Sequence, residues 1–298
     1  MSELPASLQS WFARGQRTQV LDRSLFYIDV GPTRAPAEGA PVLLLVHGFP
    51  TSSHDFHRVI DRLALDHRVI VHDHLGFGLS DKPVNYSYSL LEQAEYALAL
   101  WTGLGVRSAR VLAHDYGTSV VTEILARRQR GFSDLEVERL VLCNGSMHIE
   151  LASLSASQRL LEGPKGLARA FVKFSNKAFF CARIRGTLGP SSHLDDGDLE
   201  AMWAGVERDG GRQRLIDLSS YLEERRRFWH RWIGALRRCE LPTLVLWGRR
   251  DPIAVAAIAE QLHTEMVGSE LCWLDSLGHF PMLEDPDAWV EPVLGFLA

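Results

Sequence analysis

The chain has 298 residues, of which 46% are hydrophobic, enough for one large compact domain or a domain with an insertion. Its net charge of −5 argues against the basic surface that nucleic-acid binding requires. The longest apolar runs have only the length of a strand, so we expect no membrane span. Residues 1–14 lack the apolar stretch of a secretory leader, and the four cysteines form no C-x-x-C pair. We therefore expect a cytoplasmic protein, either a monomer or a homodimer.

Short apolar runs alternate with helical patterns along most of the chain, which is typical of a parallel sheet with crossover helices. The expected strands are an entry hairpin at 16–20 and 24–30, followed by apolar runs at 42–46, 69–71, 111–113, 140–143, 244–247 and 271–274. Continuous apolar runs indicate strands that are covered on both faces. Helices are indicated at 90–104, where Ser89 and Glu92 suggest a capping box, and at 120–129. The predicted fold class is α/β, with an eight-stranded, mostly parallel sheet and helices on both faces.

The alternation stops between residues 146 and 238, where the pattern is helical throughout. Helices are predicted there at 151–161, 165–180, 196–208 and 213–238. The segment holds 16 Lys and Arg against 11 acids, a balance of +5 that leaves −10 for the rest of the chain. An all-helical insertion between the sixth and seventh strands indicates a cap. We therefore divide the chain into a core of residues 1–145, a helical cap of 146–238 and a second core part of 239–298. The run Arg225–Arg227 is interpreted as a solvated helix face.

A sharp turn between a strand and a helix is predicted at Asp115. Such a turn needs small residues two positions before and after its centre, and Ala113 and Gly117 meet that need. The helix N-terminus also favours the ionised, nucleophilic form of a carboxyl group. The alternative is that Asp115 only caps the helix.

The order of two further residues in the chain indicates a catalytic site. Asp251 follows the seventh strand and His279 follows the eighth, so an acid and then a histidine come after Asp115 in the chain. Hydrolases with a nucleophile on such a strand-to-helix turn use this order of nucleophile, acid and histidine. We expect Asp251 to hold one imidazole nitrogen of His279, so that the other nitrogen can deprotonate water. Taken singly, either residue could be structural.

The segment His47-Gly-Phe-Pro50 after the third strand completes the predicted site. Its turn can direct the backbone N–H of Phe49 into the site, where it would form an oxyanion hole with the N–H of Tyr116. As an ordered set, this segment and the three residues Asp115, Asp251 and His279 predict an active site.

These motifs together resemble the α/β-hydrolase superfamily, and within it the branch of epoxide hydrolases and haloalkane or haloacetate dehalogenases that carry Asp at the turn. The segment 73–83 is similar to the glycine-rich loop after the fourth strand of that branch. Segments 114–117, 142–146, 202–205 and 231–236 resemble most closely the group of mesoderm-specific transcript proteins and their bacterial relatives. The resemblance implies an α/β-hydrolase fold and a cofactor-independent hydrolase of a small, apolar, electrophilic substrate.

The resemblance further implies a covalent alkyl ester on Asp115 that is hydrolysed by water activated by His279. Opening an epoxide needs an acid, usually a pair of cap tyrosines, and the cap contains only Tyr221. An alkyl halide needs N–H donors, and the branch's usual Asn and Trp are replaced here by Phe49 and Tyr116. We expect epoxides as substrates, with haloalkanes or haloacetates as the alternative. A non-catalytic protein that binds a small ligand on the same fold is a further alternative.

Five residues are expected to contact the substrate: His47, Pro50, Asn144, Trp203 and Trp229. Asn144 could instead satisfy loop backbone, and a cap tryptophan (Trp203, Trp229 or Trp232) would supply an indole N–H to a halide. No metal is expected, because the pairs His54/His57 and His72/His74 have no acid or cysteine at a suitable spacing.

Overall fold

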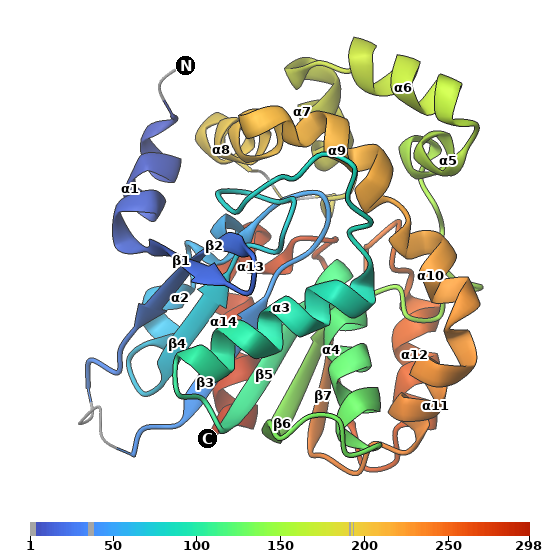
Figure 1. Ribbon diagram of the computed structural model, residues 1–298. Helices are drawn as coiled ribbons and strands as arrows, with labels where there is room; N and C mark the ends of the chain where they lie inside the picture. The colour runs from blue at the N-terminus through green and yellow to red at the C-terminus, as the bar shows by residue number, and fades with distance from the viewer. Residues whose placement is uncertain (1–3, 35–38, 191, 193) are drawn as a thin grey trace.

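The computed structural model describes residues 4–34, 39–190, 192 and 194–298 (Figure 1). Its strands are β1 (Gln16–Val20), β2 (Arg23–Val30), β3 (Val42–Val46), β4 (Arg68–His72), β5 (Ser108–His114), β6 (Glu136–Cys143), β7 (Thr243–Gly248) and β8 (Glu270–Leu274). They form one sheet in the order β1-β2-β4-β3-β5-β6-β7-β8. β2 pairs antiparallel with β1 and β4, and the other neighbours are parallel. The predicted fold class is confirmed.

Helices cover both faces of the sheet (Figure 1). One face carries α3 (Leu90–Gly103), α4 (Tyr116–Arg128), α11 (Trp229–Arg237) and α12 (Ala256–Glu265); the other carries α2 (Ile60–Leu63) and α14 (Pro286–Leu297). Successive side chains of a strand point to opposite faces, so Leu44 and Val46 of β3 enter one core while Leu43 and Leu45 enter the other. Such two-sided burial explains the continuous apolar runs. β8 differs, because it lies at the sheet edge and is only half-buried.

Two local features at the surface were not predicted from the sequence. Residues 6–14 form a helix, α1 (Ala6–Arg14), that buries Leu8 and Trp11; residues 1–3 of the segment examined for a leader lie outside the described residues. The capping box at α3 is absent. Ser89 Oγ accepts a hydrogen bond from the Leu91 N–H, but the Glu92 carboxylate instead accepts from the hydroxyls of Tyr86 and Ser87.

The segment between β6 and β7 is helical, but its helices are shorter than expected. They are α5 (Ala156–Glu162), α6 (Lys165–Phe174), α7 (Lys177–Arg185), α8 (Asp196–Glu207), α9 (Gly211–Leu218), α10 (Tyr221–Arg227) and α11, with a short 3₁₀ turn at η2 (Arg208–Gly210). A second 3₁₀ turn, η1 (Ser53–Phe56), lies outside this segment, between β3 and α2. The single helices predicted at 165–180 and 213–238 are wrong. Asn176 begins a new helix, because its side chain accepts a hydrogen bond from the Phe179 N–H.

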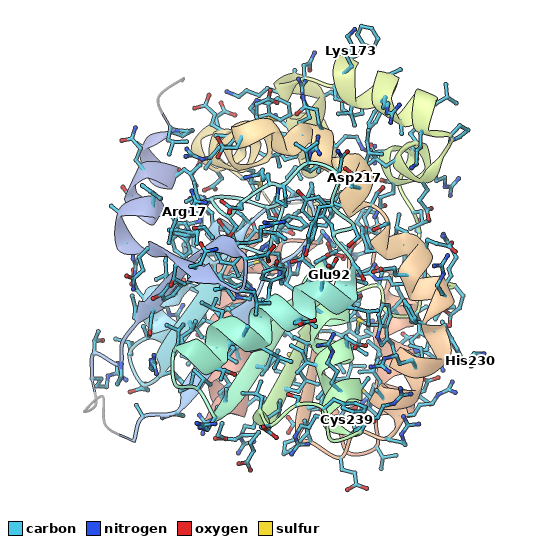
Figure 2. The ribbon with its side chains drawn as sticks, viewed as in Figure 1. Arg17, Glu92, Lys173, Asp217, His230 and Cys239 are labelled. Carbon is cyan, nitrogen blue, oxygen red and sulfur yellow. The ribbon has the colours of Figure 1, made fainter. Side chains whose placement is uncertain are left out.

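The last helices of this segment do not lie over the strand ends. In Figure 1, α5–α9 lie above the sheet, whereas α11 runs down beside α4 and contacts both α4 and α12. Figure 2 likewise shows His230 of α11 beside the sheet layer and Lys173 of α6 at the top of the molecule. We therefore propose that the cap is narrower than residues 146–238 and ends before α11. In the core, the short helix α13 (Pro281–Glu284) follows the loop after β8 and precedes α14.

Candidate active site

Asp115 stands on a strained turn between β5 and α4. Its φ is +44°, a region that side-chain-bearing residues rarely adopt, and its N–H donates to the Cys143 carbonyl at 3.1 Å. A Cβ on Gly117 would lie 2.4 Å from the Val46 carbonyl oxygen, so the helix can approach β3 only because this residue is glycine. Although Asp115 occupies the N-cap of α4, its side chain makes no capping hydrogen bond. The carboxylate is therefore directed elsewhere.

One oxygen of that carboxylate is held by the loop after β3. The Phe49 N–H donates to Asp115 Oδ2 at 2.9 Å. Tyr116 is the first residue of α4, so its N–H has no acceptor within the helix. The two backbone groups expected to form an oxyanion hole therefore flank Asp115.

His279 and Asp251 lie on the neighbouring loops after β8 and β7. His279 Nδ1 is 2.6 Å from Asp251 Oδ2, and His279 Nε2 is 3.9 Å from Asp115 Oδ2. The second oxygen of Asp251 accepts from the N–H groups of Ile253 (2.7 Å) and Ala254 (3.0 Å). All three side chains of the predicted triad thus converge, and each is almost fully buried.

The charges of this buried group are strongly coupled. Burial alone would raise the pKa of Asp115, but neighbouring His279, together with Arg225 and His114, lowers it to about 2. Burial alone would lower the pKa of His279, but the carboxylates of Asp251 and Asp115 outweigh it and raise that pKa well above the ordinary value. Asp115 is therefore held as a carboxylate, and the two carboxylates favour the protonated form of His279.

A buried cation that the sequence analysis did not predict lies behind Asp115. Arg225 is only 1% exposed, and its guanidinium donates to Ser119 Oγ at 2.8 Å and to the Asp115 carbonyl at 3.4 Å. It also stacks 4.5 Å from the ring centroid of Tyr221. The interpretation of Arg225–Arg227 as a solvated face is therefore wrong for its first member, although Arg226 and Arg227 are exposed.

Asn144 and His47 do not reach the cavity, which corrects their expected role in substrate binding. Asn144 is fully buried; its Nδ2 donates to Asp251 Oδ2 at 2.7 Å and its Oδ1 accepts from the Gly248 N–H at 3.0 Å. His47 Nε2 accepts from the His74 N–H at 3.0 Å. Both side chains instead form hydrogen bonds that hold the loops at the carboxyl ends of the strands in place.

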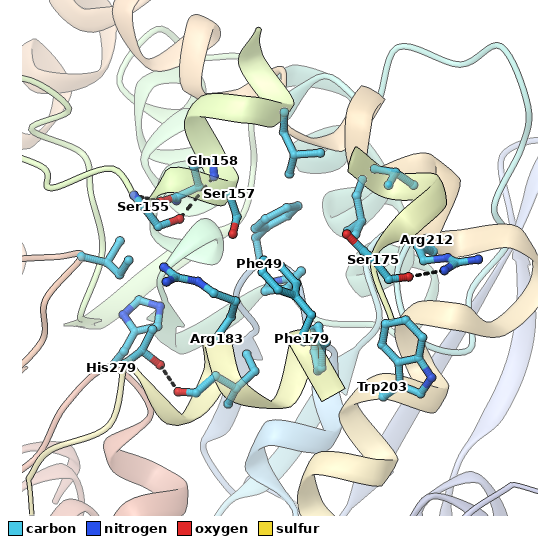
Figure 3. A pocket seen from close by; sticks show the side chains of 18 of the residues that line it. Phe49, Ser155, Ser157, Gln158, Ser175, Phe179, Arg183, Trp203, Arg212 and His279 are labelled. Carbon is cyan, nitrogen blue, oxygen red and sulfur yellow. Dashed lines mark hydrogen bonds between the residues drawn. The ribbon is translucent and has the colours of Figure 1, made fainter. Parts of the chain in front are cut away.

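A cavity of about 130 Å³ opens beside Asp115 and His279 (Figure 3). Core residues Phe49, Pro50, Ile253 and Phe280 line one side of it. The cap supplies the rest, namely Ser155, Ser157, Gln158, Leu161, Phe171, Val172, Ser175, Phe179, Phe180, Arg183, Ile184, Thr187, Trp203, Arg212 and Leu215. Most of these side chains are apolar, which suits an apolar ligand. Pro50 and Trp203, which we expect to contact the substrate, line this cavity.

Trp229 and Trp232 lie away from the cavity, because α11 packs beside the sheet. The Trp229 indole N–H donates to Glu150 at 2.9 Å, and that of Trp232 donates to Glu123 at 2.8 Å. The expectation that Trp229 contacts the substrate is therefore corrected. Of the three cap tryptophans considered, only Trp203 lines the cavity.

Tyr221 lies just behind the cavity wall at the start of the short helix α10, not within a long cap helix. Its ring packs 5.4 Å from that of Phe49 and 5.3 Å from that of Tyr116. Its hydroxyl accepts a hydrogen bond from Gln158 Nε2 at 3.0 Å, and Gln158 lines the cavity. Burial, and then the charge of Asp115, raise the pKa of Tyr221. The phenol is therefore neutral and one side chain away from the cavity.

Two absences concern only the described part of the chain. No group of three or more His, Cys, Asp or Glu side chains within it is arranged to hold a metal. Nor is any of its helices long and apolar enough to cross a bilayer.

The fold and the converging triad define an α/β-hydrolase, and comparison with known proteins agrees. Residues 41–286 match the family described as alpha/beta hydrolase fold, so the chain belongs to that family and is a hydrolase of that fold. It is 33% identical over 302 residues to the mesoderm-specific transcript homolog protein of Homo sapiens, across 99% of this chain and 89% of that protein. LipZ of Mycobacterium tuberculosis is 38% identical over 257 residues, which are 86% of this chain and 88% of LipZ. The expected likeness to the mesoderm-specific transcript group is confirmed.

A solved structure shows the same architecture. Haloalkane dehalogenase DbeA from Bradyrhizobium elkani USDA94 superposes with a TM-score of 0.80 at 24% identity, covering 95% of this chain and 97% of that chain. At this identity the likeness establishes the fold alone.

Several residues at the site were missed from the sequence. Gln158, Phe179, Phe180 and Arg183 come from helices whose inner sides could not be chosen by periodicity alone. For Arg183 the sequence offers one signal, a cation directly after the apolar run Ala178–Ala182.

Proposed function

We propose that this protein hydrolyses an apolar electrophile through a covalent ester on Asp115. A carboxylate oxygen of Asp115 attacks a saturated carbon, a C–O bond forms, and the bond from that carbon to its leaving group breaks. Water then attacks the carboxyl carbon of the ester while His279 takes its proton. The oxyanion that forms would be stabilised by the N–H groups of Phe49 and Tyr116, and the alcohol leaves with a proton from His279.

The proposal rests on one observation, namely which groups the Asp115 carboxylate contacts. A carboxylate that merely capped α4 would accept hydrogen bonds from the first turn of the helix, and this one does not. Instead it lines the cavity, receives the Phe49 N–H and faces His279. A carboxylate in place of a hydroxyl favours attack on an alkyl carbon, because the product is an ester that water can still hydrolyse.

Epoxides are the substrate class that we favour. Ring opening creates an alkoxide, which needs a proton as the C–O bond breaks. Tyr221 accepts its hydrogen bond from Gln158, so its own O–H proton is not used in that bond. Gln158 lies between this phenol and the cavity, so the acid role requires Gln158 to move aside.

Alkyl halides are a second candidate because of two other cavity residues. Trp203 lines the cavity and could present its indole N–H to a leaving halide. Arg183 also lines it, and its charge would suit the carboxylate of a haloacetate.

The test is turnover of a panel of styrene-type epoxides, haloalkanes and haloacetates, with diol or released halide as the readout. A single turnover in heavy-oxygen water should then place label in the Asp115 carboxylate. An active preparation with label only in the product would contradict the covalent mechanism. No turnover of any class, combined with tight binding of apolar ligands, would favour the non-catalytic alternative.

A further inference from the structure

One stripe of α6 is apolar and yet faces solvent. Leu167, Ala170 and Phe174 lie three and four residues apart, so they share one side of the helix. Leu167 is 59% exposed and Phe174 is 78% exposed, whereas Ala168 and Val172 on the opposite side are buried. Figure 1 shows α6 at the outer edge of the cap. Large apolar side chains gathered at an outer edge indicate an interaction surface.

A basic stripe lies next to the apolar one. Lys165, Arg169 and Lys173 recur every four residues and are exposed, and none has a carboxylate partner among the described residues. Figure 2 shows Lys173 at the tip of the cap, pointing away from the body of the protein. Residues 156–185 contain seven Lys and Arg and one Glu, a net charge of +6, although the whole chain carries −5. This concentration of positive charge suits an anionic partner.

The apolar stripe continues toward the cavity. Phe171, on the next side of α6, lines the cavity. Phe179 of α7 also lines it and is itself 41% exposed (Figure 3). A path of apolar side chains therefore runs from the exposed stripe of α6 to the space beside Asp115.

We propose that α6 docks on an anionic lipid surface. Leu167 and Phe174 would enter the boundary between headgroups and acyl chains, while Lys165, Arg169 and Lys173 would contact lipid phosphates. An amphipathic helix with Leu and Phe on one side and Lys and Arg on another binds membranes in this way without spanning them. An apolar substrate would then reach the cavity directly from the bilayer.

A second copy of this chain is a less suitable occupant of the same surface. In a two-fold symmetric dimer, this surface would face itself, which would bring two basic stripes together. The repulsion between like charges opposes such a contact.

The test is co-sedimentation of the full-length protein with lipid vesicles. We expect binding to vesicles that contain phosphatidylglycerol and little binding to pure phosphatidylcholine, and added salt should weaken the binding. The variant Lys165→Glu/Arg169→Glu/Lys173→Glu should bind at least a hundredfold more weakly, since each lost cation reduces binding about fivefold. Leu167→Ser/Phe174→Ser should reduce binding more than tenfold, because it removes the side chains that would insert.

A matched control lies after the carboxyl end of α4. Arg130→Glu/Phe132→Ser also removes an exposed cation and an exposed aromatic side chain, but far from the cap, and it should bind like the wild type. Circular dichroism of every variant should match that of the wild type, because all the altered side chains are exposed. Failure of the wild type to bind anionic vesicles, or unchanged binding by the α6 variants, would overturn the proposal. A concentration-dependent dimer that Phe174→Ser abolishes, without vesicle binding, would assign the surface to a second copy.

Discussion

Replacing Asn144 should destabilise the loops that carry the triad. Its amide joins the end of β6 to Asp251 and Gly248, and its φ is +46°, which Asn tolerates better than other residues with a side chain. Loss of the hydrogen bond to the carboxylate costs about 2 kcal/mol, and loss of the bond from Gly248 costs about 1 kcal/mol. An alanine in this conformation adds about 1 kcal/mol. The free energy of unfolding should therefore fall by about 4 kcal/mol in Asn144→Ala. In Asn144→Gly, which avoids the strain, it should fall by about 3 kcal/mol.

The assay is urea denaturation monitored by circular dichroism. The dependence of the unfolding free energy on urea concentration should have the same slope in every variant. Asn85 provides the control, because it is exposed and also has a positive φ, of +56°. Asn85→Ala should lose only about 1 kcal/mol, the cost of the conformation alone. An Asn144→Ala variant that loses no more than Asn85→Ala would refute the reasoning.

Kinetics of Asn144→Gly separate positioning from substrate binding. If Asn144 positions Asp251, kcat should fall while KM stays nearly constant, because the imidazole of His279 is then less firmly held. A rise in KM at constant kcat would restore the original expectation that Asn144 contacts the substrate.

The remaining predictions concern other titratable and charged side chains of the site. His279→Gln should permit alkylation but stall hydrolysis, so intact-mass spectra should show a stable adduct. Normal turnover by this variant would remove the histidine from the mechanism. Asp251→Asn should slow hydrolysis less completely, as measured by rapid-quench kinetics. Tyr221→Phe should lower epoxide turnover about a hundredfold and leave alkyl halide turnover nearly unchanged, whereas an equal loss on both would mean that the ring only shapes the site. Because the pKa of Asp115 is lowered from 3.8 to about 2, its charge stabilises the fold by about 2 kcal/mol above pH 4, and this contribution disappears as the pH falls toward 2. The difference in urea midpoint between the wild type and Asp115→Asn should shift accordingly over that range, and a constant difference would contradict the lowered pKa. Arg225→Met should raise the pKa of Asp115 and move the acid limb of alkylation to higher pH, and an unmoved limb would exclude an electrostatic role for this arginine.

The convergence of Asp115, Asp251 and His279 could be predicted because each residue follows a strand of a parallel sheet. The carboxyl ends of such strands meet at one edge, so residues far apart in the chain come together without knowledge of any side-chain packing. The turn at Asp115 could be predicted from Gly117, since close approach of a helix to a strand has a direct signature in residue size.

The cap could not be predicted to the same depth, because its helices are short and their inner sides depend on packing. Arg225, Arg226 and Arg227 are identical residues in a run, but each projects about 100° further round the helix, and only the first meets the core. Trp229 and Trp232 illustrate the same limit. Their helix was assigned to the cap, whereas contact with α4 places it beside the sheet. The number and type of residues were visible in the sequence, but not the direction in which each side chain points.

The coupled charges of Asp115 and His279 bear on both the mechanism and the substrate. An imidazolium cannot deprotonate water, yet the negative charge of Asp115 helps to keep His279 protonated. In the proposed mechanism, formation of the ester would remove that charge, so the pKa of His279 would fall at the step for which a base is required. The proton that His279 then releases equals the one that an opened epoxide takes up, so the first half-reaction needs no net proton from solvent. A departing halide takes up no proton, and the same step would release acid into the medium. In the proposed mechanism, an epoxide would therefore keep the proton within the site, whereas a halide would not.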